Sequence, residues 1–113
     1  MKKAAEEPDH IERFKLVIAF CFSGYYLCIN QYKPFNPLLG ETLQGEFEDG
    51  TKIYCEHTSH HPPITQFLVE AADQSYVMWG SYEFSGHMGA NNFKNGLRGS
   101  NNIKFKDGQH IRF

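Results

Sequence analysis

The sequence contains no long hydrophobic run and no strong charge of either sign. Its longest apolar stretch, residues 16–22, is far shorter than the roughly 20 residues that a membrane-spanning helix needs. The formal net charge is −2, so bulk electrostatics give no reason to expect binding to nucleic acid. We therefore expect a chain that is soluble or peripheral to a membrane and has no nucleic-acid partner.

Cysteine is scarce, and its positions do not fit a disulfide framework. Cys21, Cys28 and Cys55 are odd in number, and no two of them have the C-x-x-C spacing. Residues 1–13 are charged and lack the apolar core of a secretory leader. This combination favours three free thiols in a reducing, cytoplasmic compartment.

Aromatic residues, in contrast, are abundant. They make up 15% of the 113 residues, a chain length that suits one domain with one core. Ten Phe and six Tyr favour strands around a large apolar interior or cavity. We therefore expect a single domain rich in β-structure.

One helix is predicted near the N-terminus, after a charged segment, residues 1–8, that we expect to be disordered or frayed. Asp9 is the expected N-cap of this helix, with Glu12 as its capping-box partner. The following residues, 11–22, are apolar almost all round. This pattern indicates a helix buried on most sides, or a helix that passes into a strand at residues 17–22.

The remainder of the chain has the signals of β-structure. A strand is predicted at residues 25–32, and three hairpins follow because turn residues separate runs of high strand propensity. The hairpins are predicted at residues 42–56, 64–84 and 97–113, with turns at 48–50, 72–74 and 106–108. The Gly- and Asn-rich residues 85–96 indicate loops or short irregular strands. The expected fold class is α+β, mainly β: an N-terminal helix followed by a curved antiparallel sheet.

The densest group of functional side chains is the octapeptide at residues 56–63, Glu-His-Thr-Ser-His-His-Pro-Pro. The paired prolines fix φ and disfavour the helical region for the residue before them, so His61 is expected to be extended at a strand end. His60 and His61 then form a rigid pair of imidazoles. They could be structural loop residues, or they could bind an anion such as phosphate through ring N–H groups.

Two other interpretations of this group are a zinc site and a nucleophilic centre. Cys55, His57, His60 and His61 have the right atoms for zinc, but ligands so crowded rarely converge and no second ligand pair follows. A Cys55 or Ser59 nucleophile would need an orienting group and an oxyanion hole, which have no sequence signature here. No metal, cofactor or enzymatic activity is therefore predicted.

A second segment, residues 33–41, strengthens the interpretation as an anion site. Pro34 and Pro37 stiffen this segment. Lys33 supplies an ammonium group, which is a common phosphate ligand, and Asn36 offers an amide donor beside it. The alternative is a solvated lysine in a structural turn.

Together, these two segments resemble the oxysterol-binding protein family. Residues 56–63 match six of the eight positions of the family's fingerprint, Glu-Gln-Val-Ser-His-His-Pro-Pro, with His57 in place of Gln and Thr58 in place of Val. We expect these two replacements to tune packing. Residues 33–41, Lys-Pro-Phe-Asn-Pro-Leu-Leu-Gly-Glu, are similar to the family's upstream block, and the resemblance is strongest over residues 22–67.

The resemblance implies a lipid-binding domain, which in this family is an incomplete antiparallel β-barrel around an apolar tunnel closed by an N-terminal lid. Residues 9–113 would form part of such a barrel. The chain stops at residues 111–113 inside an apparent strand, where an unpaired edge is an aggregation hazard. We therefore expect a domain that is truncated at its C-terminus and lacks the lid.

The resemblance also implies ligands and the residues that bind them. The expected function is non-vesicular transfer of a sterol, phosphatidylinositol 4-phosphate or both, with transient contact at intracellular membranes. His60 and His61 would bind the 4-phosphate. Lys33 and Asn36, helped by backbone amides near Phe35, would bind the inositol and its glycerol-linked phosphate. The alternative is a truncated, non-transporting remnant or an interaction module with no closed lipid tunnel.

Overall fold

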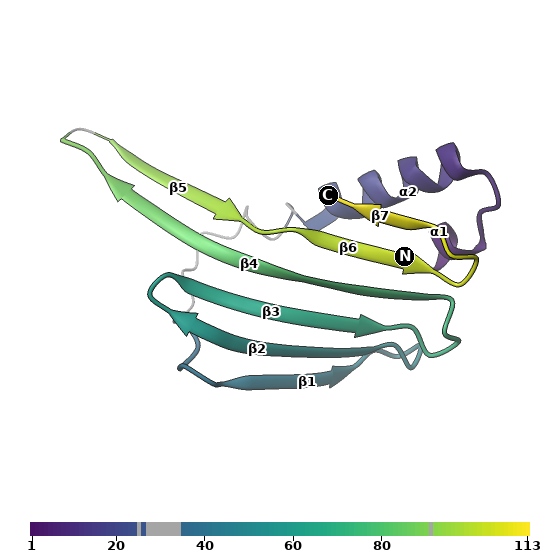
Figure 1. Ribbon diagram of the computed structural model, residues 1–113, viewed down its shortest axis with the longest axis horizontal. Coiled ribbons are helices and arrows are strands. Elements are labelled where there is room, and N and C mark those ends of the chain that lie inside the picture. Colours follow the sequence, from purple (N-terminus) through teal and green to yellow (C-terminus); the bar gives the residue numbers. More distant parts are fainter. Residues whose placement is uncertain (25, 27–34, 91) are drawn as a thin grey trace.

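The computed structural model describes residues 1–24, 26, 35–90 and 92–113. Within them, two helices, α1 (Lys2–Glu6) and α2 (His10–Ser23), precede the strands. The strands are β1 (Thr42–Glu46), β2 (Lys52–His60), β3 (Pro63–Glu70), β4 (Tyr76–Met88), β5 (Phe93–Arg98), β6 (Asn101–Phe105) and β7 (His110–Arg112). They form one antiparallel sheet in the order β1-β2-β3-β4-β6-β7, with β5 also paired to β4 (Figure 1). The fold is mainly β, and the sequence-based expectation of an antiparallel sheet after an N-terminal helix is confirmed.

The long strand β4 organises the sheet because it has three strand neighbours. It pairs with β3 through residues 77–83 on one edge, and with β6 through residues 76–80 and β5 through residues 83–88 on the other. The chain passes from β5 to β6 at Gly99, which has a φ of 142°. A Cβ atom there would overlap the carbonyl of Ser81, so only glycine allows this close approach.

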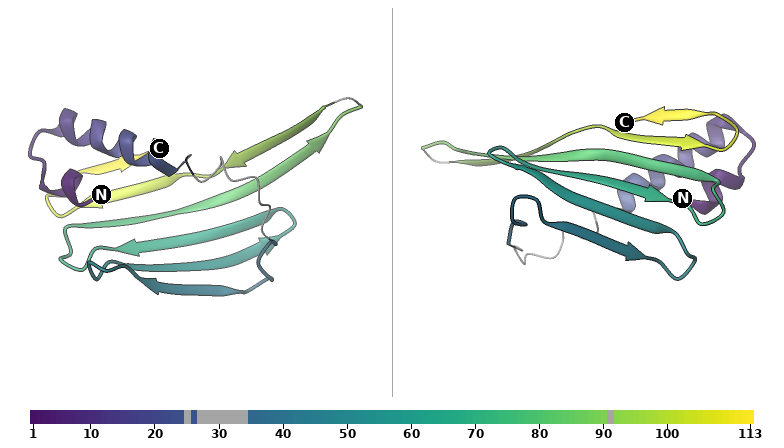
Figure 2. Two further views of the ribbon diagram at one scale, coloured as in Figure 1. Left: turned by 180° about the vertical axis from the view of Figure 1, so that it is seen from behind. Right: turned by 60° about the horizontal axis from the view of Figure 1, so that its bottom comes forward.

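The three predicted hairpin turns are present, although the third hairpin begins at Asn101 because residues 97–98 belong to β5. Residues 85–96, expected to form loops or short irregular strands, lie mostly in strands: β4 continues to Met88, and β5 starts at Phe93. The resulting hairpin projects beyond the rest of the sheet (Figures 1 and 2). At its tip the Gly89 amide donates to the Asn92 carbonyl at 2.8 Å. Gly89 and Asn92 thus belong to the turn between the two strands, whereas Gly86, Asn95 and Gly96 lie within the strands.

The helix α2 begins where the sequence predicts. The Asp9 carboxylate accepts from the backbone amides of Ile11 and Glu12 at 2.8 and 2.9 Å, which satisfies two of the free donors at the helix start. The expected capping box is wrong, because the Asp9 amide donates to the side chain of Glu7 at 3.0 Å. Glu12 instead accepts from Lys15, one helical turn further on, at 2.7 Å.

The two helices cover one end of the sheet. Ala4 of α1 and Val17 of α2 are buried against Ile103, Phe105 and Ile111, and both helices lie beside β6 and β7 (Figures 1 and 2). The expectation that residues 1–8 are disordered or frayed therefore differs from the structure. Burial of Ala4, which is 2% exposed, stabilises the short helix α1 even though three of its five residues are charged.

The helix α2 is less buried than its all-round apolar sequence suggests. It stays helical to Ser23, so it does not pass into a strand, and its buried residues are Arg13 and Val17. Its large apolar residues that are 38% to 68% exposed are Ile11, Phe14, Ile18, Phe20 and Phe22. No described helix is long and apolar enough to cross a membrane. Only one stripe of α2 meets the sheet, and the apolar pattern could not show which stripe.

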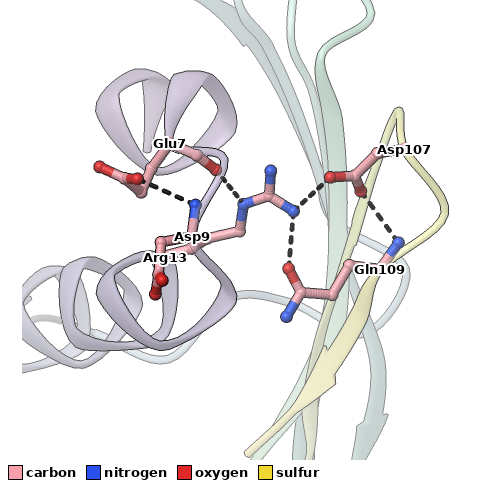
Figure 3. Close-up of polar contacts among 5 residues, drawn as sticks. All are labelled: Glu7, Asp9, Arg13, Asp107 and Gln109. Atoms are coloured by element: carbon pink, nitrogen blue, oxygen red, sulfur yellow. Dashed lines mark hydrogen bonds and ion pairs between the residues drawn. The ribbon is translucent and has the colours of Figure 1, made fainter.

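Arg13 joins α2 to the β6–β7 hairpin, and the sequence analysis did not single it out (Figure 3). Its Nε donates to the Glu7 carbonyl at 3.0 Å, and its Nη1 donates to Asp107 at 2.5 Å and Gln109 at 2.6 Å. The guanidinium carbon also lies 4.7 Å from the ring centroid of Phe105. The residue is 3% exposed, so these partners replace the water that its charge would otherwise bind.

Candidate functional site

The predicted histidine pair lies at the tight connection between β2 and β3. The strand β2 ends at His60, and His60 pairs with Pro63 at the start of β3. Both His60 and His61 are exposed, and their rings are in edge-to-face contact with centroids 5.0 Å apart. The two imidazoles thus sit side by side at the end of a hairpin, where a ligand can reach them.

A β-bulge in β2 determines which histidines share a face of the sheet. His57 pairs with Thr65, whereas Ser59 already pairs with Ile64, so the register shifts by one residue between them. In a regular strand, residues three apart would face opposite sides. The extra residue of the bulge turns His60 back to the side of His57.

His57 is the buried member of the histidine cluster, with 2% of its surface exposed. Its Nδ1 lies 3.1 Å from the hydroxyl of Thr65, and its Nε2 lies 3.2 Å from Nδ1 of His60. The rings of His57 and His60 meet edge to face, with centroids 5.5 Å apart. A continuous row of polar contacts therefore runs from Thr65 through His57 to His60, whose ring in turn touches that of His61.

This contact of His57 with His60 was not predicted from the sequence, where His57 was weighed as a zinc ligand and then expected to tune packing. The signal in the sequence is the spacing of His57 and His60, three residues apart in a strand. Without the bulge that spacing predicts opposite faces, so the contact depends on a local irregularity that strand alternation does not show. The partner Thr65 comes from the neighbouring strand and was found only through the register.

The second predicted segment, residues 33–41, is held against β2 at its C-terminal end. The Gly40 amide donates to the His57 carbonyl at 2.8 Å, and the His57 amide donates to the Glu41 carbonyl at 2.9 Å. The Glu41 carboxylate accepts from the Leu38 amide at 2.7 Å, and Gly40 adopts a φ of 79° in this turn. The two sequence motifs therefore meet through backbone hydrogen bonds at His57.

The predicted ligands of this segment are placed only in part. Phe35 and Asn36 are exposed, and Lys33 lies outside the described residues, as does the strand predicted at residues 25–32 apart from Tyr26. The structure thus brings the C-terminal end of the segment to the histidine strand and leaves Phe35 and Asn36 open to solvent.

The geometry supports anion binding better than metal or nucleophilic chemistry. Across the described ranges, no group of three or more His, Cys, Asp and Glu side chains is placed to hold a metal ion. Burial raises the pKa of the Cys55 thiol, which lowers the thiolate fraction at neutral pH. The exposed rings of His60 and His61, in contrast, can donate N–H groups to the oxygens of an anion.

An open groove of about 770 Å³ crosses the strands β1 to β4 and β6. Its lining includes the side-chain row Gln44, Tyr54, Leu68, Trp79 and Asn102, which the strand register places directly opposite one another. Strand alternation puts this row on the face opposite to His57. The groove is therefore separate from the histidine cluster.

Comparison with known protein families gives one match that spans the chain. The family model for oxysterol-binding protein matches residues 1–113. The chain is 43% identical over 113 residues to oxysterol-binding protein 9 of Dictyostelium discoideum, and it covers 26% of that protein. It is also 43% identical over 84 residues to human oxysterol-binding protein-related protein 6, a match that covers 70% of this chain and 9% of the relative. The chain thus spans about a quarter or less of these relatives.

Solved structures share the fold. The chain matches the Osh1 ORD domain in complex with cholesterol with a TM-score of 0.85 at 26% identity, covering 98% of this chain and 27% of that one. It matches the Osh3 ORD from Saccharomyces cerevisiae in complex with PI(4)P with a TM-score of 0.84 at 28% identity, covering 98% and 30%. The helices and sheet described above correspond to part of a larger domain in both.

Proposed function

The chain belongs to the oxysterol-binding protein family, and from that premise we propose that it binds lipid, with a phosphoinositide headgroup held at the β2–β3 hairpin. The family resemblance predicted from residues 33–41 and 56–63 is thereby confirmed. The observation that carries the headgroup proposal is the pair of adjacent, exposed imidazoles of His60 and His61 at the end of that hairpin. Ring N–H groups there can donate to phosphate oxygens, most strongly when an imidazole is protonated.

The segment before β1 supplies the second part of the proposed site. Lys33 and Asn36, with the backbone near Phe35, would bind the inositol and its glycerol-linked phosphate. The hydrogen bonds of Gly40 and Glu41 to the backbone of His57 support this proposal. They fix the end of the segment beside the strand that carries the histidine pair.

The activity that we propose for the whole protein is non-vesicular transfer of a sterol, phosphatidylinositol 4-phosphate or both between membranes. The complexes of Osh1 with cholesterol and Osh3 with PI(4)P support this choice of ligands. Such transfer needs no bond to be made or broken. The protein has to shield an apolar tail from water and hold a polar headgroup in a fixed orientation. It would act in the cytoplasm through transient, peripheral contact with intracellular membranes.

Replacing His60 and His61 together by Ala tests the headgroup site. The double variant should lose binding to vesicles that contain phosphatidylinositol 4-phosphate, while binding of a fluorescent sterol is unchanged. The matched control replaces His10 and His110, two exposed histidines at the start of α2 and in β7. Vesicle co-sedimentation measures the result. If the His60/His61 variant sediments with these vesicles as the wild type does, the headgroup assignment is wrong.

The alternative, an interaction module without a closed lipid tunnel, is favoured by the openness of the sheet. Within the described residues β1 and β7 end the strand order on opposite sides, so the strands do not close on themselves. Binding of a fluorescent sterol to the monodisperse 113-residue protein separates the two functions. Saturable binding would reject the interaction module, and its absence would reject an independent lipid site in this chain.

A further inference from the structure

We infer that His57 is a positioning residue that orients the ring of His60 and presents its Nε2 atom to a phosphate group, an inference that rests on the proposed function. His57 is one of the two positions at which the octapeptide differs from the family fingerprint. It has no access to an anion itself, because only 2% of its surface is exposed. Its effect therefore has to pass through His60.

The contact between the two rings fixes which nitrogen of His60 faces outwards. Nδ1 of His60 lies 3.2 Å from Nε2 of His57, so this nitrogen is already engaged inside the protein. The other ring nitrogen, Nε2, is on the far side of an imidazole that is exposed to solvent. An exposed histidine without such a partner could turn either nitrogen towards a ligand, at the cost of the rotamer freedom that is lost on binding.

The hydrogen bond also restricts where the protons lie. One of the two facing nitrogens has to carry a proton and the other has to accept it, so the rings cannot both be fully protonated while the bond exists. When both rings are neutral and His57 donates, His60 carries its proton on Nε2. When His60 is positively charged, its Nδ1–H donates to a neutral His57. In both of these arrangements Nε2 of His60 is a donor, as a phosphate oxygen requires. In the third arrangement both rings are neutral and Nδ1 of His60 donates, so its Nε2 carries no proton. A bound phosphate therefore selects one of the first two.

Thr65 makes both arrangements possible. Its hydroxyl lies 3.1 Å from Nδ1 of His57 and can either donate to that nitrogen or accept from it. In the charged state the contacts form a chain from the anion through His60 and His57 to Thr65, with every polar atom of the buried ring paired. The arrangement is like the outer partner that holds a metal-bound histidine in place, where loss of the partner typically weakens binding about 10- to 100-fold.

Two substitutions of His57 separate orientation from packing. His57→Leu fills the space without any hydrogen bond, whereas the side-chain amide of His57→Gln can still donate to Nδ1 of His60. The matched control is His110→Leu, which removes another histidine whose ring is hydrogen-bonded, in this case to Asn102. Two measurements are needed on the 113-residue protein: the ¹⁵N chemical shifts of the His60 ring, and the affinity for two probes. The probes are vesicles with phosphatidylinositol 4-phosphate and inorganic phosphate.

We expect His57→Leu to release Nδ1 of His60 from its hydrogen bond, as seen in its ¹⁵N shift, and to weaken vesicle binding about tenfold. His57→Gln should restore most of the hydrogen bond and most of the vesicle binding. The control, His110→Leu, should change neither the His60 ring shifts nor the binding. If His57→Leu weakens binding of both probes, His60 contacts the phosphate group itself. If it weakens binding of the vesicles alone, His60 contacts the lipid headgroup.

The inference is overturned if the His60 ring shifts are the same in the wild type, His57→Leu and His57→Gln. It is also overturned if His57→Leu and His57→Gln weaken binding equally. Equal losses are expected if His57 contributes only by packing, since both substitutions change the packing. If the wild type binds neither probe but His57→Leu still releases the ring, the headgroup function fails and the orientation by His57 stands. Because the wild-type shifts alone report the engaged Nδ1, the test remains decisive even if the leucine variant does not fold.

Discussion

Replacement of Arg13 by Met should destabilise the fold strongly, because this one side chain links three parts of the structure (Figure 3). It is 3% exposed and donates to the Glu7 carbonyl, Asp107 and Gln109. Met keeps much of the volume and the apolar stem, so the change removes the hydrogen bonds and the charge with little change in packing.

The magnitude follows from the contacts that are lost. Hydrogen bonds to a charged group are worth about 1.5–3 kcal/mol each, and a desolvated cation–π contact is worth about 2 kcal/mol. The cost of burying the guanidinium offsets much of this sum, and removal of one partner of a buried ion pair typically costs about 3–5 kcal/mol. The side chain of Asp107 is 46% exposed, so water can solvate it once Arg13 is gone. We therefore expect Arg13→Met to lower the free energy of unfolding by an amount at the lower end of this range, about 3 kcal/mol.

Urea unfolding followed by the fluorescence of the single tryptophan measures this loss. Trp79 stacks on His110 of β7 with ring centroids 5.6 Å apart, so it reports directly on this end of the sheet. The midpoint should fall while the slope with denaturant is unchanged. Arg13→Lys should recover only part of the loss, since lysine keeps the charge but lacks the planar fork that reaches several acceptors.

Lys15→Met is the matched control, because Lys15 forms an ion pair with Glu12 on the exposed side of the same helix. Exposed pairs of this kind contribute little to stability, so its midpoint should stay close to that of the wild type. Equal losses for Arg13→Met and Lys15→Met would refute the reasoning that burial and the three acceptors make Arg13 special.

Two further predictions concern glycine positions and acid stability. Gly99→Ala should prevent folding or strongly destabilise the fold, because the new Cβ would overlap the Ser81 carbonyl. Gly40 has open space around it and a φ of 79°, so Gly40→Ala should cost only about 1 kcal/mol of backbone strain. Similar thermal midpoints for the two variants would contradict this. The protein should also lose stability in acid, because backbone amides lower the pKa of Asp9, Asp49 and Asp107 below 3.8 in the folded state. Because each carboxyl has a lower pKa in the folded state than in the unfolded state, its ionised form stabilises the fold at any pH above the unfolded-state pKa. This stabilisation is lost as the pH falls through the folded-state pKa. Urea midpoints measured from about pH 6 to about pH 2 test this, and a flat profile below about pH 4 would argue against it.

Local signals in the sequence were enough for the elements and for the family motif. The cap at Asp9 and the three hairpin turns were predicted correctly because each depends on residues within a few positions of one another. At residues 85–96 the sequence left loops and short irregular strands open, and the pairing of β5 with the end of β4 shows that most of these residues are in strands. The disorder or fraying expected at residues 1–8 differs from the structure, because Ala4 is ordered by core residues about 100 positions away in the sequence.

What the sequence by itself determined is therefore the chemistry of the candidate site: the paired histidines, the prolines that follow them and the upstream Lys-Pro-Phe-Asn-Pro segment. The tertiary structure decided which of these groups meet. A bulge in β2 turned His57 towards His60, the register with β3 supplied Thr65, and backbone pairing brought Gly40 to the same strand. The physical reason is that side-chain type is a local property, whereas strand register and the face of a side chain depend on partners that are distant in the sequence.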